Sequence, residues 1–117
     1  MKLLIITLFY LSGLTTPVDS VSKTGKATYY AKKFEGRRTT SGAIYDPKKY
    51  TAAHKTLPFG TQVKVTNLNN GKSVIVFIND RGPFGKGLII DVSALAAKEI
   101  GLYGKGVAPC KITYNLP

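Results

Sequence analysis

The fold of this chain is organised around residues 73–84, SVIVFINDRGPF. Residues 74–78 are five consecutive β-branched or aromatic apolar residues, a pattern typical of a strand buried on both faces. Gly82 and Pro83 end the strand, because proline donates no hydrogen bond to a neighbouring strand and glycine tolerates a turn. The strand therefore presents Asp80 at its end, where the carboxylate can either take part in catalysis or simply cap the turn.

Turn residues divide the rest of the chain into short apolar segments. Asn69-Asn70-Gly71 supplies the positive φ angles of a tight hairpin between a strand over residues 62–68 and the strand that follows. Three further segments have strand composition, and residues 52–54 fit either a strand or one helical turn. The three segments are residues 27–31, 88–92 and 107–114.

A single helix is expected, over residues 94–100, with Ser93 as its N-cap and Gly101 as its stop. Residues 22–26 are predicted to be a polar lead into the domain. About six short strands with one helix indicate an all-β fold. Its predicted form is a small, mostly antiparallel barrel, because closure removes the exposed strand edges of so short a chain.

The N-terminus has the pattern of an export signal. Lys2 precedes an apolar run over residues 3–14, which is shorter than the roughly 20 residues that span a bilayer. Residues 1–20 are therefore predicted to be a signal peptide and residues 21–117 one domain. Because the first twenty residues contain no cysteine for lipid attachment, we expect no stable membrane anchor after processing. The predicted location is the periplasm, the cell wall or the extracellular space.

Charge and side-chain chemistry narrow the classes of partner. Seventeen Lys and Arg against six Asp and Glu give a formal net charge of +11, which favours anionic wall polymers. The cations are dispersed and no nucleic-acid-binding motif is present, so no nucleic acid is expected. With one His and one Cys, no metal or other cofactor is expected either. Cys110 is predicted to be a small buried apolar residue, and the protein to be a monomer.

Six motifs occur together in order over nearly all of residues 21–117. They are GKATYY (25–30), FEGRRTTSG (34–42), LPFGT (57–61), VTNLNNGKSV (65–74), NDRGPF (79–84) and IDVS (90–93). In this combination the chain resembles the rare lipoprotein A family of septal lytic transglycosylases. The resemblance implies a six-stranded double-psi β-barrel that cleaves peptidoglycan glycan strands, preferably those without stem peptides, between N-acetylmuramic acid and N-acetylglucosamine.

The resemblance also implies how the bond is cleaved. The muramic C6 hydroxyl attacks its own anomeric carbon and leaves a 1,6-anhydro end, so no second carboxylate is needed to activate water. The family's catalytic aspartate falls on Asp80, which is expected to act first as acid and then as base, and its site histidine falls on His54, which is expected to assist. The glutamate that usually follows Ser-Gly in the first loop is replaced by Ala43.

Four further residues are candidates for binding substrate. Asn79 and Arg81 flank the aspartate, and Arg81 is expected either to bind the glycan or to hold Asp80 through its charge. Tyr45 and Tyr50 are expected either to stack on sugar faces or to pack in the core.

Asp91 comes just before the helix cap. It is expected to satisfy amides at the helix N-terminus rather than to act as a second catalytic carboxylate.

Two functions follow from these residues. The first is an endolytic lytic transglycosylase that acts in cell-wall organisation and division. The alternative is an inactive, expansin-like module that binds or loosens glycan, because Ala43 cannot transfer a proton.

Overall fold

The computed structural model describes residues 20–116. The expected signal peptide lies outside these residues except for Ser20, at which the first strand begins. Within residues 20–116, no helix has the length and apolar character needed to cross a membrane.

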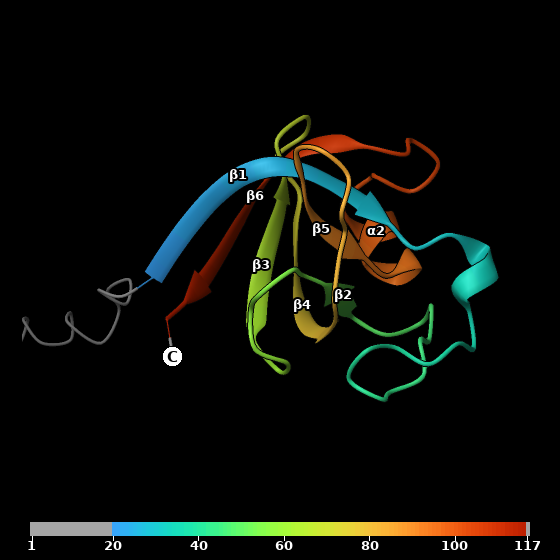
Figure 1. The fold of residues 1–117 in the computed structure, drawn as a ribbon. Helices are drawn as coiled ribbons and strands as arrows, with labels where there is room; N and C mark the ends of the chain where they lie inside the picture. Colours follow the sequence, from blue (N-terminus) through green and yellow to red (C-terminus); the bar gives the residue numbers. More distant parts are fainter. Residues whose placement is uncertain (1–19, 117) are drawn as a thin grey trace, which may run out of the picture.

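Six strands and one short α-helix make up the described part of the chain (Figure 1). In chain order the elements are β1 (Ser20–Tyr29), a 3-10 turn η1 (Lys32–Phe34), β2 (Thr51–Ala53), β3 (Gln62–Asn67), β4 (Ser73–Asp80), β5 (Leu88–Val92), α2 (Ala94–Glu99) and β6 (Ala108–Asn115). The strands form a closed barrel in the order β1-β5-β2-β4-β3-β6. Two neighbouring pairs, β1 with β5 and β2 with β4, are parallel, and the others are antiparallel. The predicted all-β, mostly antiparallel barrel with one helix is confirmed.

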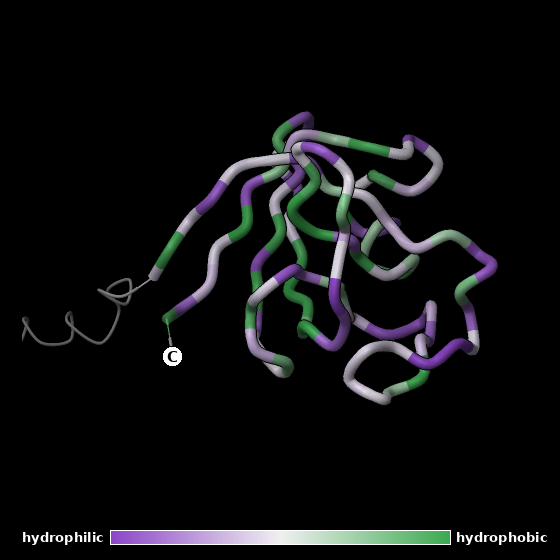
Figure 2. Tube along the Cα trace, viewed as in Figure 1, coloured by the Kyte–Doolittle hydropathy of each residue, from purple (hydrophilic) through white to green (hydrophobic). Residues whose placement is uncertain are grey.

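Strand β4 is buried on one face only. Val76 and Ile78 are fully buried inside the barrel, whereas Ile75 and Phe77 are 42% and 47% exposed on its outer surface. The prediction of burial on both faces was wrong, because a closed barrel of this size has one packed interior and its strands alternate between that interior and solvent. Figure 2 shows hydrophobic residues along several of the barrel strands and hydrophilic residues in many of the connecting loops.

Strand β1 is longer than predicted and ends at Tyr29. Residues 22–26, expected to be a polar lead into the domain, belong to this strand and pair antiparallel with β6. Their polar side chains are compatible with a strand because this part of β1 is largely exposed and its backbone groups pair with the neighbouring strand. In Figure 1, β1 is the long curved strand that crosses the barrel beside β6.

The hairpin and the helix form where the sequence places them. Strands β3 and β4 pair antiparallel, and Gly71 in their connection has a φ of +77°. The Ser93 hydroxyl accepts a hydrogen bond from the Ala96 amide at 3.3 Å, and Gly101 follows the helix with a φ of +71°. Residues 51–53 form a strand, β2, rather than a helical turn.

The core fills the barrel with branched aliphatic side chains from β3, β4, β5 and β6 and from residues just after α2, whereas β1 and β2 each contribute a buried alanine. Cys110 is among the fully buried residues, and burial raises the pKa of its thiol to about 11. The prediction of Cys110 as a small buried apolar residue is therefore confirmed. The largest fully buried side chains are Ile78, Ile90, Ile100, Leu102 and Ile112.

Candidate active site

A break in strand pairing turns Asp80 to the outside of the barrel. Ala52 of β2 pairs with Ile78 of β4, but the next residue, Ala53, pairs with Asp80, so that Asn79 is an extra residue in β4. Because successive side chains of a strand point to opposite faces, this β-bulge moves Asp80 from the inner face to the outer face. The carboxylate thus stands on the barrel surface at the end of a core strand.

Three donors hold the Asp80 carboxylate. Oδ2 accepts a hydrogen bond from the Tyr30 hydroxyl, and Oδ1 accepts from the amides of Thr40 and Arg81 at 2.8 and 2.9 Å. Burial alone would raise the pKa of Asp80, but the hydrogen bonds from Tyr30 and the two amides outweigh it and lower the pKa below its usual value. Asp80 is therefore ionised at neutral pH.

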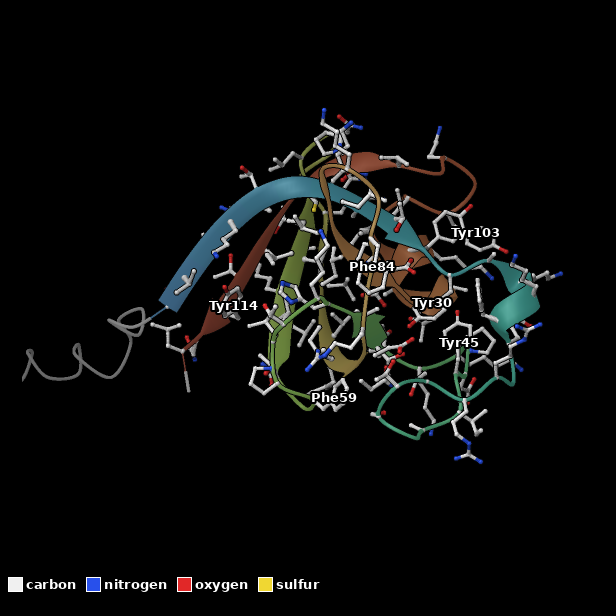
Figure 3. The ribbon with its side chains drawn as sticks, in the orientation of Figure 1. Tyr30, Tyr45, Phe59, Phe84, Tyr103 and Tyr114 are labelled. Atoms are coloured by element: carbon white, nitrogen blue, oxygen red, sulfur yellow. The ribbon has the colours of Figure 1, made fainter. Side chains whose placement is uncertain are left out.

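Tyr30, just after β1, is fixed by stacking. The centre of its ring lies 4.3 Å from that of Tyr45, with 13° between the planes (Figure 3). The Tyr30 ring also meets the ring of Phe34 edge-on. Burial and then the hydrogen bond to Asp80 raise the pKa of Tyr30 above its usual value, so the hydroxyl stays a donor. Tyr45 is only 3% exposed, and its hydroxyl accepts a hydrogen bond from the Ala94 amide of α2. Of the two expected roles for Tyr45, core packing is the observed one and sugar stacking was wrong.

His54 is joined to Asp80 through the backbone. The His54 amide donates to the Asp80 carbonyl at 3.1 Å. Nδ1 of the ring accepts from the amides of Thr56 and Leu57 at 3.1 and 3.0 Å, so the proton of the neutral ring is on Nε2. Burial, then the positive charges of Arg81 and two lysines, lower the pKa of His54. Among residues 20–116, no side-chain hydrogen bond joins the His54 ring to the Asp80 carboxylate.

The Arg81 guanidinium points away from the Asp80 carboxylate. Nη1 donates to the carbonyls of His54 and Leu57 at 3.1 and 2.7 Å, and the guanidinium carbon lies 4.2 Å from the centre of the Phe59 ring. The Arg81 side chain therefore stabilises the loop after β2, and the Arg81 amide binds the Asp80 carboxylate. An ion pair between the Arg81 guanidinium and Asp80 was instead one of the two roles expected from the sequence.

The bulge residue Asn79 anchors the first loop. Its carbonyl accepts a hydrogen bond from the Ser41 amide at 3.4 Å, which keeps residues 38–44 beside the end of β4. Ala43 is exposed on this loop, and its amide donates to the Ser41 hydroxyl at 3.3 Å. The position that carries a glutamate in the resembled family thus lies on the same loop as the Thr40 amide that binds Asp80.

Tyr50 is not brought to the carboxylate. Its hydroxyl donates to Glu99 at 2.5 Å, and its ring lines a separate hollow of about 370 Å³ on the outer side of β4, together with Ile75, Phe77 and Glu99. None of the residues that line this hollow contributes a hydrogen bond to Asp80. Tyr50 is 40% exposed beside this hollow, so the expectation that it packs in the core was wrong.

Asp91 occupies a different environment from the expected one. Its carboxylate accepts a hydrogen bond from the Thr28 hydroxyl at 3.2 Å, while the helix cap is supplied by Ser93. Burial raises the pKa of Asp91 to about 6, with the charge of Asp80 adding to the effect and the Thr28 hydrogen bond opposing it. The prediction that Asp91 caps the helix was wrong, because the side chain of this strand residue projects from the barrel rather than toward the helix.

Sequence reasoning missed three features of the site. Tyr30 is the last residue of the GKATYY motif, and its position next to Asp80 could have been suspected only from that motif. The amide of Thr40 carries no signal in the sequence. Phe84 belongs to NDRGPF, and its ring is 79% exposed on the loop after Asp80.

A groove of about 570 Å³ adjoins the loop after β2, to which the Arg81 side chain donates its hydrogen bonds. It is bounded by residues 57–61, by β3 and by the end of β6, and its lining includes the exposed aromatic Phe59 and the polar side chains of Gln62 and Lys64. Within the described part of the chain, no group of three or more His, Cys, Asp or Glu side chains could hold a metal ion. The arrangement instead offers acid–base chemistry beside an aromatic and polar surface.

Comparison with known proteins gives one family. The sequence model of the double-psi β-barrel family described as lytic transglycolase matches residues 22–112. The chain is 52% identical over 103 residues to the endolytic peptidoglycan transglycosylase RlpA of Pasteurella multocida, a match that covers 88% of this chain and 35% of the relative. It is 54% identical over 93 residues to the protein of the same name from Haemophilus influenzae, covering 80% of this chain and 32% of the relative. The chain thus spans about a third of the length of these curated relatives.

Solved structures share the fold at low sequence identity. The Streptomyces papain inhibitor is 24% identical with a TM-score of 0.63, and the match covers 83% of this chain and 96% of that protein. An expansin of Clavibacter michiganensis is 22% identical with a TM-score of 0.60, covering 83% of this chain and 52% of the expansin. At this level of identity the two structures support the barrel fold alone.

Proposed function

The chain belongs to the lytic transglycolase family, and from this premise we propose that it cleaves glycan strands of bacterial peptidoglycan endolytically. The bond broken is the one between N-acetylmuramic acid and N-acetylglucosamine, and the product carries a 1,6-anhydro end. One observation carries the proposal. An ionised carboxylate, Asp80, is held by three donors on the barrel surface at the end of a core strand.

The chemistry needs a group that removes a proton from the muramic C6 hydroxyl as this oxygen attacks the anomeric carbon. Asp80 suits this role because it is ionised and rigidly positioned, so that it can act as a general base without reorganising. His54 assists as a positioning and binding group. Its neutral ring leaves Nε2–H free of the two amides that occupy Nδ1, and a sugar oxygen is a suitable acceptor.

The surface near Asp80 supports binding of a saccharide chain. Phe84 and Phe59 are exposed aromatic rings on the loops next to Asp80 and Arg81, and such rings stack on the apolar faces of sugars. The groove beyond Phe59 adds polar side chains and Lys64. We assign substrate binding to these groups rather than to Tyr45 and Tyr50.

The proposed place of action is the cell envelope, after export through the N-terminal signal. The names of the relatives support a peptidoglycan substrate, and the net charge of +11 supports attraction to anionic wall polymers. The protein is proposed to act as a monomer on the glycan strand.

The test is digestion of peptidoglycan whose stem peptides have been removed, followed by mass spectrometry of the soluble products. We expect glycan fragments with 1,6-anhydro ends from the wild type. The Asp80→Asn variant is expected to lose at least about a hundredfold in rate, the contribution typical of a positioned general base. Full activity of Asp80→Asn would show that the base is another residue, and absence of anhydro ends from the wild type would overturn the proposed reaction.

A second candidate function rests on Ala43. If this loop lacks a required carboxylate, the barrel binds or loosens glycan without cutting it, as an expansin does. The Ala43→Glu variant separates the two cases, with Ala43→Gln as a control that has nearly the same shape without the charge. A glycan-binding module would bind peptidoglycan sacculi and release no anhydro ends in the wild type, and Ala43→Glu would then be needed for any turnover.

A further inference from the structure

A row of four outward-facing side chains crosses the barrel next to the candidate active site. Thr28 of β1 lies opposite Asp91 of β5, Asp91 lies opposite Ala53 of β2, and Ala53 lies opposite Asp80 of β4. The flanking residues of β5, Ile90 and Val92, are fully buried, so that Asp91 projects outward. Two carboxyl groups therefore stand on the same surface with a single alanine between them.

The spacing of this row fits a pair of groups that act on one bond. Asp80 and Asp91 are separated by two strand spacings, roughly 10 Å between their Cα atoms. Carboxyl pairs that act on opposite sides of a glycosidic bond are about 5 to 9.5 Å apart, measured between the carboxyl groups, and side chains on Cα atoms roughly 10 Å apart can reach this separation. Ala53 has only a methyl group, which packs with Tyr30 and Tyr45 in a small buried cluster. Tyr30 of this cluster donates the hydrogen bond of its hydroxyl to Asp80.

The two carboxyl groups differ in what surrounds them. Asp80 has three donors, whereas Asp91 has the Thr28 hydroxyl as its one donor. Asp80, Tyr30 and Tyr45 interact with Asp91 through their charges, and all three are acids rather than cations. Asp91 consequently keeps its proton to a higher pH than Asp80, with a pKa raised to about 6 while that of Asp80 is lowered. Opposite shifts in neighbouring carboxyl groups are the usual basis for separate acid and base roles.

We propose that Asp91 is the general acid of this site, the catalytic residue that protonates the leaving glycosidic oxygen, while Asp80 is the base. This assignment rests on the proposed function and deepens it. The proton of Asp91 passes to the oxygen of the leaving N-acetylglucosamine as the bond from that oxygen to the muramic anomeric carbon breaks. The C6 oxygen bonds to the same carbon, and its proton passes to Asp80. One proton is given and one is taken, and no water is consumed.

The site is restored when Asp80 releases its proton to solvent and Asp91 takes one up. Because Asp91 is partly exposed at the surface, this exchange requires no internal path. In this arrangement the loop position occupied by Ala43 does not need to carry a proton. The chain then has a complete acid–base pair from two strands of its own barrel.

The experiment compares Asp91→Asn and Asp80→Asn on two substrates. One is the natural glycan strand without stem peptides, and the other is a short glycan whose terminal muramic acid carries a 4-nitrophenyl leaving group, which departs without protonation. Asp91→Asn should lose at least about a hundredfold on the natural strand but less than about tenfold on the nitrophenyl substrate. Asp80→Asn should lose strongly on both. Thermal unfolding and binding to sacculi check that each variant is folded.

A second variant keeps the test independent of the folding of Asp91→Asn. Thr28→Val removes the one hydrogen bond that lowers the pKa of Asp91 and keeps the shape of the side chain. Because an acid must be protonated to act, the wild-type rate should fall as pH rises through about 6, and Thr28→Val should move this fall to higher pH. Thr24→Val, an exposed threonine on the same strand, is the matched control and should leave the profile unchanged.

The outcomes distinguish the role of Asp91 from the proposed lytic transglycosylase activity. Anhydro ends from the wild type, with an unchanged rate for Asp91→Asn or an equal loss on both substrates, would overturn the role of Asp91 and leave the proposed function standing. An unshifted pH profile in Thr28→Val would count against it in the same way. No anhydro ends from the wild type would overturn the proposed function itself.

Discussion

Replacing Asp91 with Asn should make the protein more stable at neutral pH. The folded protein holds the Asp91 carboxyl in a partly buried position with one hydrogen-bond donor, and its pKa rises from 3.8 to about 6. Between these two values the folded state binds more protons than the unfolded state. The free energy of unfolding therefore falls as pH rises through this window, and the full loss is present above it.

The size of the effect follows from the shift. A rise in the pKa of Asp91 from 3.8 to about 6 corresponds to about 3 kcal/mol at about 1.36 kcal/mol for each pH unit, which is an upper value because Asp91 is partly exposed. Asparagine has nearly the same shape, can still accept the hydrogen bond from Thr28 and carries no charge. At pH 8 the variant should therefore gain about 1 to 3 kcal/mol over the wild type, and at pH 3.5 the difference should disappear.

Urea unfolding followed by circular dichroism at pH 3.5, 5, 6.5 and 8 measures this difference directly. Asp80→Asn is the control of opposite sign, because the pKa of Asp80 is lowered in the folded state and its charge stabilises the fold above that pKa. If Asp91→Asn is less stable than the wild type at pH 8, or if the difference does not change with pH, then Asp91 is not held in the environment described here.

Three further predictions concern single side chains. Tyr30→Phe keeps the stacked ring but removes a donor that lowers the pKa of Asp80, so the fall in kcat/KM at low pH should move to higher pH; an unshifted profile would remove Tyr30 from the acid–base network. Asn67→Ala removes the buried amide that donates to the Ile100 carbonyl at 2.8 Å and should lower the free energy of unfolding by about 1 to 3 kcal/mol in urea titrations. Phe84→Ala should raise KM for glycan several-fold with little change in Tm, because the ring is 79% exposed; an unchanged KM would exclude it from substrate binding.

Local pattern was enough to predict the elements around the candidate site. The apolar run before Asp80, the turn at Asn69-Asn70-Gly71 and the Ser93 cap each act through neighbouring residues, and each forms as expected. Burial was less predictable. Ile75 and Phe77 have the composition of core residues but lie on the outside, because the number of packed faces depends on whether the sheet closes.

The roles of single residues were harder to assign. Tyr45 and Tyr50 have the same chemistry in the sequence, yet one packs under Tyr30 and the other bonds to Glu99 on another part of the surface. Asp91 stands two residues before a helix cap, which made capping the natural interpretation. Its neighbours are instead Thr28 on one adjacent strand and Ala53 on the other.

The amino-acid sequence alone predicts that a core strand ends at Asp80. It also predicts that a turn follows, which leaves the Asp80 carboxylate accessible. It could not determine which way the carboxylate points or what it meets. That depends on one extra residue, Asn79, in the pairing of β4 with β2, and on Tyr30, which is 50 positions away in the chain. Side-chain alternation along a strand is local, whereas the register between strands that are not neighbours in sequence is set only when the barrel closes. Closure is what places Tyr30, Asp91 and Asp80 on one surface.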